Sequence, residues 1–476
     1  MSDRLSTAAF PASSLSGMMS PESVQRWLDE NFSRLVAEHE VPGASVAVLT
    51  QGQVLTSAAG VLSLATGVEA TTDSVFQIGS ITKLWTSALV MQLVDDGLVD
   101  LDAPLRTYLP EFAVGDEAAS ATITTRHLLC HVAGFEGDVF TDTGRGDDAV
   151  EKYLASIHHL PQLCPPGEVF SYNNAGFVVL GRLVEVLRGK PFDQVLVERL
   201  AGPLGLTHVC PSPYEAILHR AAVGHVPGPD GTIAAAPVWA LARSNAPAGA
   251  MLAMTPRDLL GFVAMHLAGG TAPDGSVILK PGTVAAMQRP QVKVPRLTGM
   301  GGAWGLGWEM EEHDGHTVIG HDGGTIGQAA FLRFAPEHGV AIALLTNGGG
   351  FFGVFTDVLA HLLKELTGIT LPGHPAPPAE PETIDATPYL GRYSDTIYDI
   401  TVSQDADGAI WLDRVPKDII AEIGEKPMRT RLVHFEGDSL ISVESTQGIH
   451  PIFAFIGRDD AGLAKYIHYG RVVARA

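Results

Sequence analysis

The chain has 476 residues, enough for two or three domains, and 46% of them are hydrophobic while 18% are charged. These fractions are typical of a folded protein and exclude a disordered or fibrous chain. The formal net charge of −22 argues against nucleic acid or an anionic membrane surface as a partner.

The cysteine content and the first residues indicate in which cellular compartment the protein works. Cys130, Cys164 and Cys210 are odd in number and widely spaced, so we expect three reduced thiols and no disulfide framework. Residues 1–20 form an arm that lacks the apolar core of a secretory signal. No apolar run approaches the roughly 18–20 residues of a membrane span. We therefore expect a cytoplasmic protein without a membrane partner.

The first predicted element is an amphipathic helix over residues 21–39. Ser20 can cap it, Pro21 suits its first turn, and apolar residues follow at helical spacing. Two valine-containing apolar runs, Ala44–Leu49 and Val54–Ala59, come next and are separated by a short turn. They predict a hairpin that opens an antiparallel sheet.

Helices dominate the following part of the chain. Residues 80–96 predict a buried helix, and helical patterns broken by glycine and proline loops continue from about 98 to 270. Strand patterns return at Thr317–Ile319, Ala329–Phe334 and Val340–Leu345, before a helix at roughly 353–367. This order indicates one α/β domain over residues 21–371, whose sheet is built from both ends of the segment.

A second domain is expected after a linker. Residues 372–388 are rich in proline and acidic residues, which is typical of a linker. Over residues 389–476, short β-type segments alternate with turns. The segments are Tyr398–Val402, Ile410–Leu412, Arg431–Phe435, Leu440–Val443, Ile452–Ile456 and Tyr466–Val473. Their spacing predicts a small antiparallel barrel or sandwich.

A candidate nucleophile lies at the start of the buried helix. Ser80 and Lys83 stand at i and i+3, which share one face of a helix, so the lysine amine can reach the serine oxygen. Burial can lower a lysine pKa toward about 7–8, where the amine is a usable base. The helix N-terminus adds free N–H groups where negative charge will develop. This pattern also occurs often by chance, so its weight depends on further motifs.

A second motif, Ser171-Tyr172-Asn173-Asn174, follows a Pro-Pro-Gly loop and opens a predicted helix. A tyrosine hydroxyl there can relay a proton between the nucleophile and the leaving group. An asparagine amide can bind a substrate carbonyl and restrain the lysine. On the residues alone two registers stay open, Tyr172-x-Asn174 and Ser171-x-Asn173.

A third motif, Gly320-His321-Asp322-Gly323-Gly324, connects two predicted strands. A glycine-rich strand edge lets substrate lie against the backbone, whose N–H groups can complete an oxyanion hole. Lys280-Pro281-Gly282 competes for the same role. However, its proline cannot donate a ladder hydrogen bond, and Val284–Met287 predicts a helix. His321 is therefore favoured over Lys280.

Together the three motifs resemble those of the serine β-lactamase and penicillin-binding-protein superfamily. The nearest branch is class C β-lactamase-like, with D-aminopeptidase, esterase and transacylase relatives. Leu101-Asp102-Ala103-Pro104-Leu105 and the stretch from Ile123 to Leu129 extend the resemblance, which spans roughly residues 25–365. It implies an α/β fold, an antiparallel sheet flanked by helices with a helical insert, and a small lipocalin-like antiparallel β-barrel at the C-terminus.

The resemblance also implies roles in catalysis. Ser80 would be the acylated nucleophile and Lys83 its base. Tyr172, not Ser171, would occupy the second motif, with Asn174 at its third position. Whether Lys83 or Tyr172 takes the first proton stays open at the level of the family.

In the third motif, His321 and Gly323 would bind substrate where β-lactamases carry Lys-Thr-Gly. The N–H groups of Ser80 and Gly324 would form the oxyanion hole. No cofactor and no metal is expected, and the histidines show no metal-ligand spacing along the sequence.

Histidine in place of lysine changes what the site can recognise. Its reference pKa of about 6.5 leaves it mostly neutral at pH 7, so strong binding of a substrate carboxylate by His321 is not expected. If Asp322 keeps His321 charged, recognition of acids should rise as the pH falls. If an acid is bound independently of pH, Lys280 or another arginine must supply the charge.

The predicted function is that of a serine hydrolase or acyltransferase. It would work through a Ser80 acyl-enzyme on small-molecule or short-peptide amides and esters. One alternative is an esterase or a transacylase in natural-product biosynthesis, and another is a catalytically silent binding protein on the same fold. The acyl acceptor, whether water, amine or alcohol, is left open. The sequence is also compatible with a homo-oligomer.

Overall fold

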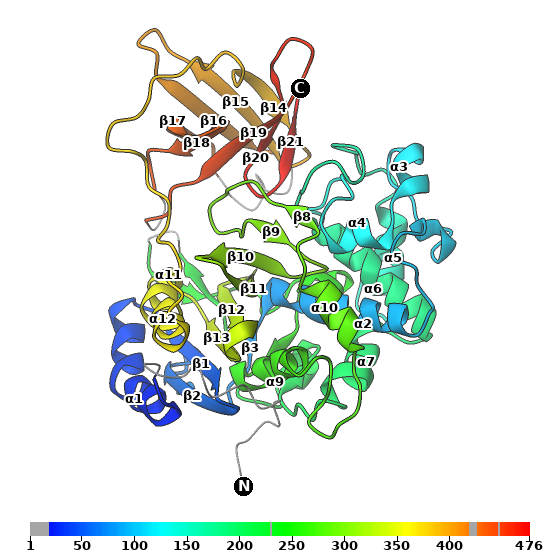
Figure 1. The fold of residues 1–476 in the computed structure, drawn as a ribbon, viewed down its shortest axis with the longest axis vertical. Coiled ribbons are helices and arrows are strands. Elements are labelled where there is room, and N and C mark those ends of the chain that lie inside the picture. The colour runs from blue at the N-terminus through cyan, green and yellow to red at the C-terminus, as the bar shows by residue number, and fades with distance from the viewer. Residues whose placement is uncertain (1–18, 229–230, 418–425, 446–447) are drawn as a thin grey trace.

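The computed structural model describes residues 19–228, 231–417, 426–445 and 448–476. All but the last two residues of the predicted N-terminal arm, 1–20, lie outside the described residues. The described chain forms an α/β domain and, above it in Figure 1, a β-barrel. This arrangement confirms the fold class expected from the sequence.

The α/β domain is organised around an antiparallel sheet with the strand order β2-β1-β13-β12-β11-β10-β9-β8. The strands are β1 (Gly43–Thr50), β2 (Gln53–Gly60), β8 (Val292–Lys293), β9 (Ala303–Trp304), β10 (Glu309–His313), β11 (His316–Thr325), β12 (Gln328–Ala335) and β13 (Val340–Thr346). β1 pairs directly with β13, Ala47 facing Ala343. The sheet is therefore built from both ends of the segment, as predicted.

Helices cover both faces of this sheet, so every residue of β1 and β13 is buried. One face packs against α1 (Pro21–Glu38) and the run α11 (Phe351–Val354), η7 (Phe355–Ala360) and α12 (His361–Thr367), as the blue and yellow ribbons of Figure 1 show. Ser20 caps α1 by accepting the Ser23 N–H, which confirms the predicted helix start.

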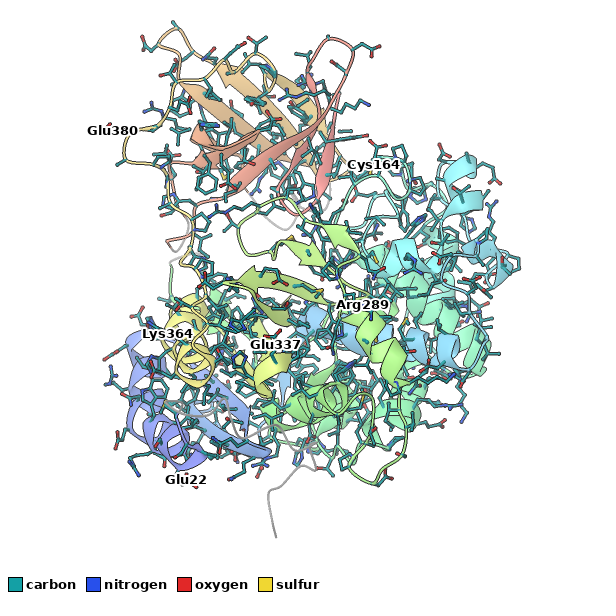
Figure 2. The ribbon with its side chains drawn as sticks, in the orientation of Figure 1. Glu22, Cys164, Arg289, Glu337, Lys364 and Glu380 are labelled. Atoms are coloured by element: carbon teal, nitrogen blue, oxygen red, sulfur yellow. The ribbon has the colours of Figure 1, made fainter. Side chains whose placement is uncertain are left out.

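The opposite face packs against three long helices: α2 (Thr82–Asp95), α6 (Asn174–Arg188) and α9 (Pro256–Leu267). Trp85 of α2 stacks on Phe262 of α9 with ring centroids 4.6 Å apart. The side chains in Figure 2 fill the space between these helices and the sheet. This packing fixes the N-terminus of α2, where Ser80 lies, against the sheet.

The helical insert contains more elements than its pattern predicted. Its shorter helices are η2 (Gly79–Ile81), η3 (Leu105–Thr107), α3 (Glu117–Thr122), α4 (Thr125–Leu129), α5 (Ala149–Ser156), α7 (Phe192–Leu196), η4 (Val197–Ala201), α8 (Pro213–Ala216) and η5 (Arg243–Ala248). The short strands β3 (Phe76–Gln77), β4 (Val209–Cys210), β5 (His225–Pro227), β6 (Ile233–Ala235) and β7 (Ala253–Met254) were not predicted. Strands of two or three residues are too short to show an alternating pattern.

The remaining helices follow the insert. α10 (Pro281–Met287) confirms the helix expected after Lys280, and η6 (Pro336–His338) joins β12 to β13. None of the helices in the described residues is long and apolar enough to cross a membrane. The three cysteines are all buried and free.

The C-terminal unit is a closed antiparallel barrel of eight strands, β14 to β21 in order. They are β14 (Gly391–Ser394), β15 (Tyr398–Gln404), β16 (Ile410–Pro416), β17 (Met428–Glu436), β18 (Ser439–Ser442), β19 (Ile452–Arg458), β20 (Ala464–His468) and β21 (Val472–Arg475). β14 closes the barrel on β21, where Tyr393 faces Arg475. The interior is a separate apolar core.

Two details of the barrel differ from the sequence prediction. The segment Tyr466–Val473 is not one strand, because a turn at Gly470, with φ of +109°, separates β20 from β21. β14 was not predicted, since only Tyr393 of its four residues is a buried apolar side chain. This turn between β20 and β21 is the part of the barrel that reaches the active site.

The barrel is joined to the α/β domain by hydrogen bonds around the second motif. The Tyr172 N–H donates to the Gly470 carbonyl at 3.0 Å, and the Val472 N–H donates to Ser171 Oγ at 3.2 Å. His468 Nε2 lies 2.7 Å from the Phe170 carbonyl oxygen. Cys164, labelled in Figure 2 at this junction, packs against Tyr466 and Val472.

We expect a chain ending at residue 375 to lose thermal stability and activity together. Its truncation exposes the apolar surface at the junction to water and removes the Gly470 carbonyl that accepts from the Tyr172 N–H, so the segment that positions Tyr172 loses its support. Circular dichroism melting and an ester hydrolysis assay on the truncated and full chains measure both effects. The exposed barrel variant Asp407→Ala is the control. An unchanged melting temperature and turnover in the truncated chain would contradict the expectation.

Candidate active site

The Ser80 turn lies against strand β11 at a distance that only glycine permits. A Cβ on Gly79, whose φ is +51°, would lie 2.6 Å from the Gly324 nitrogen, and one on Gly323 would lie 1.9 Å from the Ile78 carbonyl oxygen. The N–H groups of Ser80 and Gly324, the expected oxyanion donors, therefore lie on two backbones in direct contact. Gly324 itself is exposed to the cleft.

Lys83 lies one helical turn after Ser80 and has no exposed surface. Its Nζ donates to Ser80 Oγ at 3.0 Å and to the Ala248 carbonyl at 2.6 Å. Burial lowers the pKa of Lys83 well below its ordinary value, and the positive charge of Arg471 lowers it further, against an opposing effect of Asp138. A lysine in this environment favours the neutral amine, which can accept the Ser80 proton.

Tyr172 reaches the same cleft from the extended segment before α6. Its ring lies 4.9 Å from Lys83 Nζ and stacks on His131 with centroids 4.3 Å apart. Burial raises the pKa of Tyr172 above its ordinary value, and the nearby Ser80 hydroxyl counters part of that rise. The phenol is therefore protonated at neutral pH and can donate a proton to a leaving group.

The structure brings Tyr172, and not Ser171, into the cleft. Ser171 Oγ is occupied by the Val472 N–H of the barrel. Asn173 caps α6 by accepting the Gly176 N–H, and Asn174 donates from its side-chain amide to Asp138 Oδ1 at 2.7 Å. The amide of Asn174 thus holds a carboxylate instead of pointing freely to a substrate carbonyl.

His321 lines the cleft from β11 and is 3% exposed. Its Nδ1 lies 2.5 Å from the Asp322 carbonyl oxygen. Burial lowers the pKa of His321 to about 3, and the nearby Lys83 amine lowers it further. The Asp322 carboxylate is engaged by Arg333, with 2.5 Å from Nη1 to Oδ1. His321 is therefore neutral. This environment does not favour the alternative that Asp322 keeps His321 charged so that it can bind an acid.

Lys280 lies away from this cleft, at the start of α10. Its backbone N–H and its amine bind Asp95, at 2.7 Å to the carboxylate and 2.5 Å to the carbonyl oxygen. It is therefore not positioned to replace His321 or to bind an anion at Ser80.

Arg471 is the cation in the cleft that the sequence did not identify. It extends from the turn between β20 and β21, and its guanidinium lies 5.0 Å from the centroid of the Tyr172 ring. It pairs with Asp138, with 3.0 Å from Nη2 to Oδ1. Although burial opposes its charge, Asp138 outweighs that effect and holds the pKa of Arg471 above its ordinary value. Arg471 is therefore a permanent positive charge beside Tyr172.

Two further groups near the site were also missed. His131, with φ of +56°, accepts the Asn173 N–H on Nδ1 at 2.9 Å and so positions the second motif from behind. Glu309 lines the cleft and accepts the Gly301 N–H at 2.5 Å. Burial raises the pKa of Glu309 to about 8, against the opposing charge of Arg333. No motif spacing marks either residue.

The cleft has a volume of about 1070 Å³. Ser80, Tyr172, His321, Gly324 and Arg471 line its polar part. Apolar side chains also line the cleft, among them Val226, Ile233, Met300, Phe331, Phe351 and Phe352. The arrangement places an activated hydroxyl, a proton donor, an oxyanion pocket and a cation beside a long apolar wall.

Comparisons with known proteins identify the family of the chain. The Beta-lactamase family model matches residues 28–364. "Penicillin-binding protein 4" of Amycolatopsis lactamdurans is 45% identical over 368 residues, which cover 76% of this chain and 96% of that protein.

Among solved structures, that of SurE is similar with 28% identity and a TM-score of 0.78, over 96% of this chain and 100% of SurE. SurE has also been solved with D-Leu. The D-amino acid amidase of Ochrobactrum anthropi SV3, complexed with D-phenylalanine, is 22% identical with a TM-score of 0.60, over 72% of this chain and 99% of its own. At that identity the amidase supports the fold alone.

We expect Lys83 and Tyr172 to act with Ser80 as one unit. Lys83→Met and Tyr172→Phe should each lower kcat by at least about 10²-fold, and the double variant should lose little more than the worse single one. Steady-state kinetics on one activated ester measures the three losses. Lys152→Met and Tyr214→Phe, both at exposed positions, are matched controls. Losses that multiply in the double variant would count against a shared proton path.

We also expect any preference for acidic substrates to be independent of pH between about 5 and 7, below the pKa of about 8 of the neighbouring Glu309. His321, with its pKa near 3, stays neutral throughout this range, while Arg471 stays charged. The ratio of kcat/KM for two esters that differ only by a carboxylate or a carboxamide measures the preference. Arg471→Met should reduce it by about 10-fold or more, as expected for losing a charged hydrogen bond. A ratio that rises as the pH falls through about 6.5 would show instead that His321 titrates.

Proposed function

Because the chain belongs to the beta-lactamase family, we propose that it is a serine hydrolase or acyltransferase that acts on amides and esters of small molecules or short peptides through a Ser80 acyl-enzyme. The contact that supports this most is the 3.0 Å hydrogen bond from the fully buried Lys83 amine to Ser80 Oγ. A binding protein without catalysis would not need a buried amine at this position, where its desolvation is costly.

The reaction follows from the positions of these groups. Lys83 Nζ takes the proton of Ser80 as Oγ attacks the substrate carbonyl. Negative charge then develops on the carbonyl oxygen, where the N–H groups of Ser80 and Gly324 can donate to it. As the bond to the leaving group breaks, the Tyr172 hydroxyl can donate a proton to that group and regain one from the Lys83 ammonium, so both residues return to their starting states. Reversal of these steps with an acceptor in place of the leaving group releases the product.

The cleft favours a peptide-like acyl group. Its volume of about 1070 Å³ lies just above the range of roughly 300–1,000 Å³ that is usual for small-molecule sites. Arg471 can hold a carbonyl or carboxylate oxygen of the substrate beside Tyr172. The similarity to SurE, solved with D-Leu, supports an acyl residue of D-configuration.

Transfer to an amine is the second candidate function. Ser80, Phe351 and Phe352 line the same cleft of about 1070 Å³, a volume that can hold an acceptor as well as the acyl group. Water and an amine use the same acyl-enzyme, so the two functions differ only in what enters after the leaving group departs.

We expect peptide esters that end in D-Leu to acylate the protein once per chain. Intact-mass spectrometry after mixing with matched D-Leu and L-Leu methyl esters reports the adduct, and Ser80→Ala should lose it. Added amines should yield amide product if transfer competes with hydrolysis. An adduct that persists in Ser80→Ala, or no turnover of any ester or amide by the intact chain, would contradict the proposal.

A further inference from the structure

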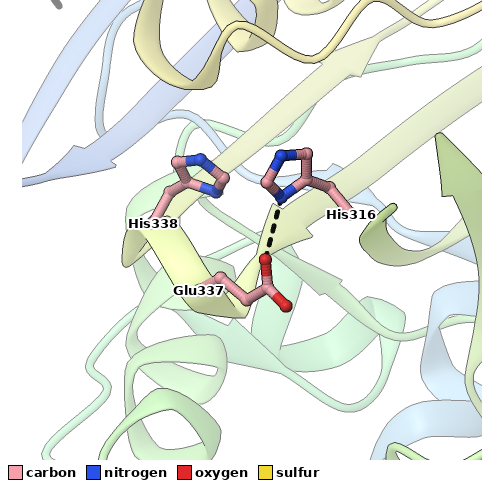
Figure 3. A group of neighbouring side chains, drawn as sticks. All are labelled: His316, Glu337 and His338. Carbon is pink, nitrogen blue, oxygen red and sulfur yellow. Dashed lines mark hydrogen bonds and ion pairs between the residues drawn. The ribbon is translucent and has the colours of Figure 1, made fainter. Parts of the chain in front are cut away.

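A group of three side chains lies at one edge of the sheet, where the central strands β11, β12 and β13 begin or end, away from the Ser80 cleft. His316 is the first residue of β11, and Glu337 and His338 belong to η6, the turn between β12 and β13. Figure 3 shows the three side chains turned toward one another. The group therefore connects two turns that are separate in sequence and adjacent in space.

The distances within this group suit one small cation. His316 Nδ1 lies 2.9 Å from Glu337 Oε2, and one ligand atom from each of the three residues lies within 4.8 Å of the others. In a tetrahedral Zn²⁺ site, ligands at about 2.0–2.2 Å from the ion lie about 3.4 Å from one another. Side-chain rotations alone can therefore close the three groups around one ion.

The hydrogen bonding of the group is incomplete in the described residues. Nδ1 of His338 is buried and has no hydrogen-bond partner among the residues that the structure describes. The His338 ring lies 5.2 Å from the His316 ring, measured between centroids. An imidazole nitrogen without a hydrogen-bond partner, beside a second imidazole and a carboxylate, is available to bind a metal ion.

We propose that His316, Glu337 and His338 together bind one divalent transition-metal ion, with Zn²⁺ the best match to a ligand set of two imidazoles and a carboxylate. A water molecule would take the fourth position, since Glu337 and His316 are partly open to solvent. The ion would tie the β10–β11 turn to the β12–β13 turn and so stabilise this edge of the sheet.

The site would be structural and not catalytic. His321 lies five positions after His316 on β11, about 17 Å along an extended strand. No metal was expected from the sequence because these ligands show no motif spacing, His316 and Glu337 being 21 positions apart. Only the pairing of β11 with β12 brings them together.

Zinc titration of the full chain tests the site. Tag-free protein treated with a chelator and dialysed should bind one Zn²⁺ in calorimetry, and its melting temperature should rise with zinc concentration. His316→Ala and His338→Ala should each weaken binding by about 10-fold or more. Glu337→Gln should also weaken zinc binding. Because glutamine has nearly the same shape as glutamate, this variant separates the loss of a ligand from misfolding. His158→Ala, an exposed histidine elsewhere, should bind like the unchanged protein.

Two outcomes would overturn the proposal. One is the absence of stoichiometric binding at up to about millimolar Zn²⁺ by the folded, unsubstituted chain. The other is binding of one ion that is as tight in His316→Ala and His338→Ala as in the unchanged protein, which would place the ion elsewhere. Neither result depends on the activity of Ser80.

Discussion

The desolvated amine of Lys83 is the constraint on which the active site depends. An ammonium group loses several kcal/mol of hydration when it is buried, so this position favours the neutral amine. The amine keeps two oxygen acceptors, Ser80 Oγ and the Ala248 carbonyl. The carbonyl is held by η5, which can approach α6 because Gly181 has no side chain: a Cβ there would lie 2.2 Å from Pro247 Cγ. Helix packing thus sets the basicity of the site.

The parts of the site that depend on local sequence were predictable. Ser80 and Lys83 are one helical turn apart, and any helix that starts near Gly79 places them together. The second motif was located by its position before a helix, but the choice of Tyr172 over Ser171 rested on the resemblance to the family. The central sheet was predictable for a similar reason, because its buried strands are continuous apolar runs, such as Val340–Leu345.

The parts that depend on tertiary burial or docking were not predictable. The protonation state of His321 follows from its enclosure by other elements, which its sequence neighbours do not reveal. Arg471 lies in a turn that looks like any other barrel turn, and it becomes part of the cleft only when the barrel contacts the segment around Tyr172. Glu309 was missed for a similar reason, since a glutamate on a short strand is ordinarily a solvated side chain.

The bond between Tyr172 and Gly470 joins residues that lie almost three hundred positions apart, and this spacing has a consequence for folding. The α/β domain and the barrel have separate apolar cores, so each can form its own contacts first. Such long-range contacts close late, because bringing distant segments together costs chain entropy. A newly folded α/β domain therefore carries its nucleophile before it acquires the guanidinium beside it. The active site is therefore complete only after the barrel has docked onto the α/β domain.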